Sequence, residues 1–416
     1  MTDRQQPEIV VTGIGLFAPG GANVDAAWKT VLEGTPAAAH DPTLEEAGLD
    51  VTVSCRTPEF DPSEEIGRRA ARRLDRFVQL ALLASREAID RSGLDLPTGE
   101  DPEEFGDRVG IAFGCGIGGV ITWEEQHASF IEKNKVSPFM IPKMLSNMAA
   151  GQVAIELGAR GPNLTVNTAC AASATAIHIA RDLLASGTAD AMLAGGTEAS
   201  ITALSTAGFA KMGALSKRKD ETASRPFDAD RDGFVMGEGA GMLVLERAED
   251  ARARGATPLA VLAGAGSSAD AHHQTSPPEE GGGAVLAMQR ALADAGMDRG
   301  DIDHINAHGT STPLNDKSES IAIRRVFGDA TDQVGVSSTK GVTGHTLGAA
   351  GGIEAVFTVL ALRDGVIPPT ANLEQLDDEI DIDVVHGEAR QGEVRAALSN
   401  SFGFGGQNAS LLFRKV

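Results

Sequence analysis

Two stretches decide the fold: NLTVNTACAASATAIHIA at residues 163–180 and QVGVSSTKGVTGHTLGAAGGIEA at residues 333–355. Each contains a short strand pattern, then a turn of small residues, then a helix pattern that is small or apolar nearly all round. A helix without a polar face is normally buried on every side. The repeated arrangement predicts two related halves that meet near residue 255, each with a sheet packed around one central helix.

Short apolar runs alternate with helical patterns along the rest of the chain, which is typical of an α/β protein with largely buried strands. The expected strands are 9–12, 109–113, 191–194, 259–263, 302–307 and 334–337. The expected helices are 71–92, 171–185, 284–295, 318–327 and 352–362. We therefore predict an N-terminal half, residues 1–255, and a C-terminal half, residues 256–416.

Composition limits the function classes. The 416 residues are 42% hydrophobic, enough for a large core, and the 36 Lys and Arg against 58 Asp and Glu give a net charge of −22. This charge repels nucleic acid and anionic membranes, so we expect neither as a partner, and an anionic partner needs a local basic patch. Three widely spaced cysteines (Cys55, Cys115 and Cys170) suit neither a disulfide framework nor a zinc site, and favour a reduced, cytoplasmic compartment. The chain starts without the apolar core of a signal peptide, and no apolar run is long enough to span a bilayer.

Cys170 is the candidate nucleophile. It ends the extended run TVNTA and opens the apolar helix of the first stretch. Free N–H groups and the positive dipole end at a helix N-terminus favour thiolate over thiol. A turn between strand and helix also holds a nucleophile rigidly at an exposed tip. The alternative is a small buried hydrophobe, the usual role of a lone Cys among alanines.

Two histidines follow predicted strands. His308 lies in HINAHGTSTPLND at the carboxyl end of a strand, the favoured edge for sites in α/β sheets. His345 lies in STKGVTGHTLGAAGG, in a glycine-rich turn before the second apolar helix. Either histidine alone suits a hydrogen-bonded structural role. Together, flanked by Gly and Thr, they are suited to donate jointly to one developing oxyanion.

Glu354 stands between Ile353 and Ala355 in the second apolar helix. A buried carboxylate must be paired or neutral. Lys340, just before the same turn, is the expected partner. A purely structural ion pair is the alternative.

Two further motifs do not fit the functions that they resemble. GCGIGG at residues 114–119 satisfies GxGxxG after a strand, but no helix clearly opens there and no suitably placed acid follows. DADRDG at residues 228–233 resembles the start of a calcium loop, but Gly239 occupies the twelfth position and Glu238 falls one short of it. We therefore expect neither a dinucleotide nor a metal ion, and no resident cofactor.

Four motifs occur in order: VNTACAASATAIHIA, INAHGTSTP, SSTKGVTGHTLGAAGGIEA and NSFGFGGQNASLLF. With these, the chain resembles the β-ketoacyl-acyl-carrier-protein synthases of the elongating type, closest to synthase II. The segment ASRPFDADRDGFVMGEGAGMLVLE also matches, as a structural segment of that family. The resemblance extends from TGIG at residues 12–15 to the last strand.

The resemblance implies the thiolase fold, two αβαβα halves in five layers, and a homodimer. It implies that Cys170 takes an acyl chain from a carrier-protein thioester, and that decarboxylation of malonyl-carrier protein then yields a 3-oxoacyl product. His308 and His345 would stabilise the enolate, and Lys340 with Glu354 would hold His345 in place. The backbone N–H groups of Cys170 and Phe404 would form the oxyanion hole for acyl transfer.

The resemblance also implies substrate contacts. The phosphopantetheine arm arrives on the carrier protein and would be bound by Thr310 and Thr312. Phe404 would gate acyl entry. The other expected contacts are the acyl-pocket residues Ile117 and Met140, the neighbouring Phe402, and Asp270 and His273 in a second mobile loop.

Acyl carrier proteins are acidic, so this acidic chain needs a basic docking spot. Arg68, Arg69, Arg72 and Arg73 are spaced to form a cationic stripe on one helix face. Further docking cations are expected at Lys133, Lys135, Lys217, Arg218 and Lys219. A solvated surface is the alternative for each of these charges.

Several rival functions share parts of this pattern. The catalytic ketosynthase subunit of a type II polyketide system, paired with a chain-length factor, has the same chemistry and stays open. A thiolase needs a second catalytic Cys, and no Cys follows Cys170. A non-catalytic chain-length factor lacks the nucleophile, and starter-unit synthases use Cys-His-Asn. Met140 and Gln407 differ from the commonest elongating pattern, which leaves the preferred acyl chain open.

Overall fold

The computed structural model describes residues 7–96 and 105–416, in which ten strands form one mixed sheet. The strands of the N-terminal half are β1 (Ile9–Phe17), β4 (Val109–Gly114), β5 (Asn163–Val166), β6 (Ala191–Glu198) and β7 (Gly239–Arg247). Those of the C-terminal half are β8 (Ala260–Ala269), β9 (His304–Asn306), β10 (Gly335–Ser337), β13 (Ala396–Gly403) and β14 (Gln407–Arg414). Two short sheets pair β2 (Ala39–His40) with β3 (Val53–Ser54) and β11 (Val366–Ile367) with β12 (Arg390–Gln391).

The strand order of the large sheet repeats from one half to the other. From the outer edge inward, the N-terminal half has the order β5-β4-β6-β7-β1 and the C-terminal half the order β10-β9-β13-β14-β8. Counted along the chain within each half, both orders are third, second, fourth, fifth, first. The outer three strands of each half are parallel and the inner pairs antiparallel. The halves join where β1 pairs with β8, so the predicted duplication is present in the topology.

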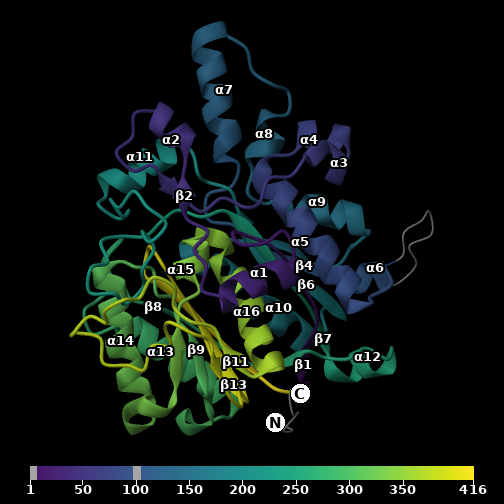
Figure 1. The fold of residues 1–416 in the computed structure, drawn as a ribbon. Helices are drawn as coiled ribbons and strands as arrows, with labels where there is room; N and C mark the ends of the chain where they lie inside the picture. The colour runs from purple at the N-terminus through teal and green to yellow at the C-terminus, as the bar shows by residue number, and fades with distance from the viewer. Residues whose placement is uncertain (1–6, 97–104) are drawn as a thin grey trace.

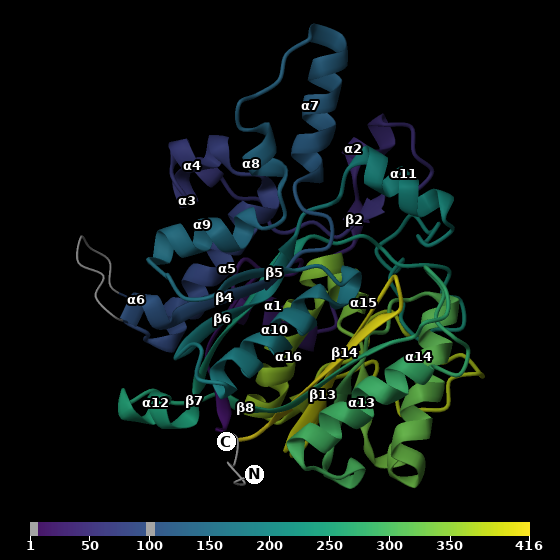
Figure 2. The ribbon, with the colours of Figure 1, turned by 180° about the vertical axis from the view of Figure 1, so that it is seen from behind.

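Two helices, α10 (Ala172–Ala185) and α16 (Ala350–Asp364), lie against each other between the two halves of the sheet (Figures 1 and 2). Every residue of α16 from Ala350 to Leu362 is buried. A Cβ atom on Gly352 would lie 2.5 Å from the Gly241 carbonyl oxygen of β7, so the helix can approach the strand only with glycine there. The two apolar stretches therefore form the central layer, as predicted.

Other helices cover the outer faces of the sheet. The helix α5 packs on β1 and β7, while α13 packs on β8 and β14 with α14 beside it (Figure 1). The α-helices other than α10 and α16 are α1 (Val24–Leu32), α2 (Pro42–Glu46), α3 (Pro62–Glu65), α4 (Arg68–Arg73), α5 (Arg76–Ser92), α6 (Phe105–Arg108), α7 (Val120–Lys133), α8 (Met140–Met144), α9 (Met148–Leu157), α11 (Ala203–Lys211), α12 (Ala248–Ala253), α13 (Gly282–Ala295), α14 (Pro313–Phe327) and α15 (Lys340–Thr343). The 3-10 turns are η1 (Ala169–Ala171), η2 (Arg299–Asp301), η3 (Gly328–Gln333) and η4 (Leu347–Ala349).

The expected single helix over residues 71–92 is wrong at its start. The helix α4 ends at Arg73, and Leu74 is extended, with a ψ of 142°. Asp75, also extended, then precedes the first residue of α5. Every other expected strand and helix overlaps an observed one, with ends moved by a few residues.

The helix α7 projects from the body of the protein, with α8 and α4 beside its base (Figures 1 and 2). The guanidinium carbon of Arg73 in α4 lies 4.9 Å from the ring centroid of Phe139, which directly precedes α8. In the described part of the chain, no helix is both long and apolar enough to cross a membrane.

Candidate active site

Cys170 lies in a sharp turn between β5 and α10. The preceding residue, Ala169, has a φ of 49°, a left-handed conformation that residues other than glycine rarely adopt. The 3-10 turn η1 then leads directly into α10. The turn leaves the Cys170 side chain 8% exposed, at the end of a channel that opens to the surface.

Burial raises the pKa of the Cys170 thiol to about 11, although Lys340 and the backbone N–H groups of Phe404 and Cys170 act in the opposite direction. Lost solvation therefore outweighs the helix N-terminus and the nearby cation, both of which favour the thiolate as expected. The predicted pair of backbone donors does lie at the sulfur. Cys170 is thus a protonated thiol at neutral pH.

His308 and His345 face each other beside this thiol. His308 follows β9, and His345 lies between α15 and η4. Their ring centroids are 5.3 Å apart with the rings nearly perpendicular, and both line the channel together with Cys170. Burial and the Lys340 charge lower the pKa of both rings well below 6.5. Both histidines are therefore neutral and retain an N–H to donate.

Lys340 and Glu354 form an ion pair in which both side chains are almost completely buried. Burial raises the pKa of Glu354 to about 7, while the Lys340 ammonium favours its charged form. The Nζ atom of Lys340 lies 3.5 Å from Nδ1 of His308. The expectation that this pair holds His345 is wrong, because its polar contact is to the other histidine.

Glu319 in α14 is a site residue that the sequence analysis missed. Its carboxylate accepts the backbone N–H of His308 at 2.8 Å and that of Gly309 at 2.8 Å. Burial raises its pKa to about 7, and it lines the channel. The signal in the sequence is slight: Glu319 is one of the two acidic residues in the helix that directly follows the His308 motif.

The channel encloses about 370 Å³. Thr310 and Thr312 line it, and their hydroxyl oxygens are 2.9 Å apart. It is also lined by four further predicted contacts: Asp270, His273, Phe402 and Phe404. Among the described lining residues neither Ile117 nor Met140 appears, so the expected acyl-pocket residues do not face this channel in the single chain.

Two loops meet over the channel. The turn after β13 contains Phe404, whose ring centroid lies 6.4 Å from that of Phe209 in α11. The Gly405 N–H donates to the Gln274 carbonyl at 2.7 Å, and the Asn408 side chain donates to Asp270 at 2.8 Å. The second loop predicted around Asp270 is therefore hydrogen-bonded to the turn that carries Phe404.

Apolar residues at the channel mouth were also missed. Phe209, Met212 and Leu314 line it, and Met212 and Leu314 are strongly exposed. They lie at the ends of α11 and α14. A single apolar residue at a helix end adds nothing to the hydrophobic periodicity from which buried or functional faces are predicted. Such side chains around an opening are typical of a contact surface.

The glycine loop at residues 114–118 binds a carboxylate of the protein itself. Backbone N–H groups of Gly116, Ile117, Gly118 and Gly348 donate to Glu198, at the end of β6. The expectation that no helix opens after this motif is wrong, because α7 begins at Val120. The N–H groups of the loop nevertheless donate to Glu198, which also accepts the N–H of Gly348 in η4 and so links the loop to that turn.

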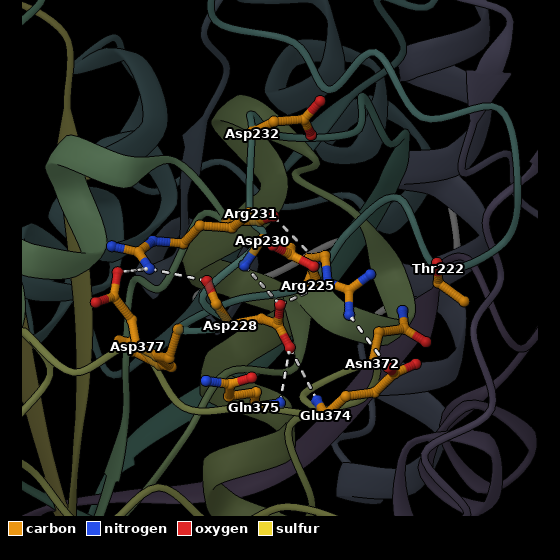
Figure 3. Close-up of polar contacts among 12 residues, drawn as sticks. Thr222, Arg225, Asp228, Asp230, Arg231, Asp232, Asn372, Glu374, Gln375 and Asp377 are labelled. Atoms are coloured by element: carbon orange, nitrogen blue, oxygen red, sulfur yellow. Dashed lines mark hydrogen bonds and ion pairs between the residues drawn. The ribbon is translucent and has the colours of Figure 1, made fainter.

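The acidic segment that resembles a calcium loop is bound internally (Figure 3). Asp228 accepts the N–H groups of Asp230, Glu374 and Gln375 and lies 3.0 Å from the Arg225 guanidinium. Among the described residues, no three His, Cys, Asp or Glu side chains are grouped to hold a metal ion.

The predicted docking cations lie in three places. Arg68, Arg69, Arg72 and Arg73 are exposed on α4, and Lys133 and Lys135 are exposed at the end of α7. Lys217, Arg218 and Lys219 follow α11, and Arg218 lies 3.8 Å from Asp230. Figures 1 and 2 place α4 and α11 on opposite sides of α7, so these cations form no single patch on one chain.

The duplicated sheet, the paired central helices and the Cys-His-His site define a condensing-enzyme class. Comparisons with known proteins agree. The N-terminal domain of the beta-ketoacyl synthases matches residues 6–251, and the C-terminal domain matches residues 259–374. The 3-oxoacyl-[acyl-carrier-protein] synthase 2 of Staphylococcus aureus (strain COL) is 44% identical over 414 residues, 99% of each chain.

Solved structures extend this similarity to three dimensions. A beta-ketoacyl synthase from Burkholderia phymatum STM815 has a TM-score of 0.91 at 34% identity, covering 99% of this chain and 100% of that one. A chain from the complex of a type II PKS acyl-carrier protein with its hexaketide-bound ketosynthase has a TM-score of 0.91 at 31% identity, with the same coverage. The chain belongs to the beta-ketoacyl synthase family, and the expected thiolase fold is confirmed.

Proposed function

We propose that this protein is a 3-oxoacyl-[acyl-carrier-protein] synthase that elongates acyl chains in fatty acid biosynthesis. The observation that carries the proposal is the convergence of Cys170, His308 and His345 at the inner end of one channel. The reaction needs only side chains and backbone donors of this chain, and the phosphopantetheine arm arrives with the substrate. Three buried free cysteines suit a reduced cytoplasmic compartment.

The first step transfers the acyl group to Cys170. The sulfur attacks the thioester carbonyl carbon of the acyl-carrier protein and loses its proton, which ends on the departing carrier thiol. Negative charge develops on the carbonyl oxygen, to which the N–H groups of Cys170 and Phe404, both near the sulfur, would donate. An acyl-enzyme thioester and free carrier thiol remain.

The second step releases CO₂ from malonyl-carrier protein. The electron pair of the breaking carbon–carbon bond moves into the thioester, whose oxygen gains negative charge. Lys340 has only donors, so Nδ1 of His308 accepts and the His308 proton lies on Nε2. This N–H and an N–H of His345 stabilise the enolate more strongly than the substrate.

The third step forms the new carbon–carbon bond. The enolate carbon attacks the acyl-Cys170 carbonyl, and the sulfur leaves with the bonding electrons and takes a proton from solvent, which restores the thiol. The product is a 3-oxoacyl thioester two carbons longer, still on the carrier protein. Thr310 and Thr312 would hold the phosphopantetheine arm in the channel, and Phe404 would gate acyl entry.

The partners follow from the charge and the exposed apolar surface. An acidic carrier protein would contact the cations on α4 and after α11. We propose a second copy of the chain as the other partner. Apolar residues are exposed on the unpaired edge strand β5 and on neighbouring helices: Leu164, Ile155, Ile141 and Leu145.

Intact-mass measurement tests the function. The protein is incubated with a panel of acyl-carrier proteins, and acylation should add the mass of one acyl chain to Cys170. Addition of malonyl-carrier protein should then remove this mass and release a 3-oxoacyl product. A protein that takes up no acyl chain from any carrier protein would overturn the proposal.

A second candidate is the catalytic ketosynthase subunit of a type II polyketide synthase. The similarity to the hexaketide-bound ketosynthase favours it. Such a subunit pairs with a chain-length factor and repeats the condensation without reduction. Condensation by the purified chain alone, as a homodimer in light scattering, would favour the elongating fatty acid synthase.

A further inference from the structure

The segment from Arg225 to Gly233 supports the loop that carries Thr310 and Thr312. Its outer end is attached to residues 374–377, because Asp228 accepts the N–H groups of Glu374 and Gln375 at 2.9 and 3.1 Å. Figure 3 shows these bonds converging on one carboxylate. These bonds hold the segment at Asp228, a few residues before Asp232 and Gly233, which line the channel.

Arg231 extends from this segment toward the loop, with only 3% of its side chain exposed. Its Nη1 atom donates to the Asp228 carbonyl at 2.8 Å and to the Asp377 carboxylate at 2.6 Å (Figure 3). Its Nε and Nη2 atoms donate to the carbonyls of Thr312 at 3.4 Å and Pro313 at 3.2 Å. One planar guanidinium therefore joins the segment to the loop backbone.

The loop backbone needs this support because it is locally strained. Ser311, between the two threonines, has a φ of 68°, which is unfavourable for a residue with a Cβ. Its hydroxyl accepts the Arg225 N–H at 2.9 Å, and its carbonyl accepts the Gly233 N–H at 3.1 Å. The same segment therefore holds the loop at three successive residues.

We propose that Arg231 is a positioning residue that fixes the Thr310–Thr312 loop in the geometry that binds the phosphopantetheine arm. This inference rests on the proposed function. It explains why an acidic segment resembling a cation loop borders the channel. The Asp228 carboxylate is paired with the Arg225 guanidinium. Arg231 pairs with Asp377 and Asp316, and its remaining donors hold the loop.

The test compares two malonyl thioesters on preformed acyl-enzyme. Malonyl-pantetheine has the arm that the threonines would bind, whereas malonyl-N-acetylcysteamine keeps the reacting group and lacks the outer arm. In Arg231→Lys, one ammonium cannot reach Asp377 and both loop carbonyls together. The KM for malonyl-pantetheine should rise about tenfold, the effect of one lost hydrogen bond, with kcat and the short thioester unaffected.

Arg181→Lys is the matched control. Arg181 is also buried, with 9% of its side chain exposed, and it donates to two carbonyls, those of Leu262 and Ala263, and to the Asp294 carboxylate. None of these three partners lines the channel, whereas Thr312 and Pro313 do. Arg181→Lys should lower the melting temperature without changing the ratio of the two KM values. If Arg231→Lys disturbs folding, Asp377→Ala, which removes one surface partner of Arg231, should change the ratio in the same direction.

The outcomes separate the two proposals. If Arg231→Lys raises the KM for both thioesters equally, or leaves the KM for malonyl-pantetheine unchanged, the positioning role alone is overturned. A wild-type protein that forms no acyl-enzyme from any acyl-carrier protein would overturn the proposed function, and this inference with it.

Discussion

The ammonium of Lys340 lies 3.5 Å from Nδ1 of His308, although His345 is much closer to it in sequence. This contact fixes the tautomer of His308, because an ammonium only donates. The same charge lowers the pKa of both histidines and favours the carboxylate of Glu354. Burial and the Lys340 charge together therefore keep the two rings neutral.

Lys340→Met should separate the stabilising role of the ion pair from its catalytic role. Removing one partner of a buried pair costs about 3–5 kcal/mol, so the free energy of unfolding should fall by this order. The double variant Lys340→Met with Glu354→Gln should recover most of that loss, because no buried charge is left. Denaturant unfolding measures both.

Release of CO₂ from malonyl-carrier protein should stay low in the double variant, because the Lys340 ammonium that donates to Nδ1 of His308 is still missing. Recovery of CO₂ release together with stability would show that Lys340 is not required to orient His308.

Alkylation of Cys170 by iodoacetamide should accelerate with pH. Burial holds its pKa at about 11, so the reactive thiolate fraction rises about tenfold per unit between about pH 7 and about pH 9. Mass spectrometry of the labelled peptide gives the rate. Burial also raises the pKa of Cys55 and Cys115, so Cys170→Ser should remain unlabelled over the same period. A rate that is flat across this range would show a thiolate already present at neutral pH.

Reversing charge on α4 should weaken carrier-protein binding. Arg68→Glu with Arg72→Glu should raise the KM for acyl-carrier protein by about tenfold with little change in kcat, because exposed contacts act equally on ground and transition states. The effect should shrink with added salt. Arg73 is left intact because it packs on Phe139.

The control for this pair is Lys29→Glu with Arg252→Glu. Both residues are exposed, on α1 and α12, and the change in net charge is the same. An unchanged KM in the α4 variant, or an equal rise in the control, would place docking elsewhere.

The central features of this site could be predicted because local sequence carries them. The two helices that lack a polar face had to be buried, and Cys170, His308 and His345 each follow a strand or a glycine-rich turn. The strands β9 and β10 are parallel, so their carboxyl ends lie at one edge of the sheet. The strand β5 belongs to the other half and runs in the opposite direction, so the packing of η1 against η4 and of α10 against α16 brings Cys170 to the histidines.

The features that the sequence did not predict depend mainly on contacts between distant segments. Glu319 lies in a polar stretch of α14, and only the fold brings its carboxylate to the backbone of His308. Burial, which no local pattern gives, decides the protonation of Cys170. The strands β13 and β14 were not predicted, because Ser, Asn and Gly interrupt their apolar runs.

His308 and His345 should serve decarboxylation and not acyl transfer. In His345→Ala, the backbone N–H groups of Cys170 and Phe404 remain, so acylation of Cys170 should proceed at nearly the wild-type rate. The enolate oxygen loses one of two donors. CO₂ release should fall about 100- to 1000-fold, as when one donor of an oxyanion hole is removed.

The assay measures acyl-enzyme mass and labelled CO₂ separately for His308→Ala and His345→Ala. Because burial and Lys340 hold both histidine pKa values well below 6.5, protonation of the two rings should produce no rise in wild-type CO₂ release as the pH falls from about 8 to about 6.5. A histidine acting as a cationic donor would instead give a rate that rises over this interval. Normal CO₂ release in both variants would leave the histidines as structural residues, since a donor that stabilises the enolate cannot be removed without slowing its formation.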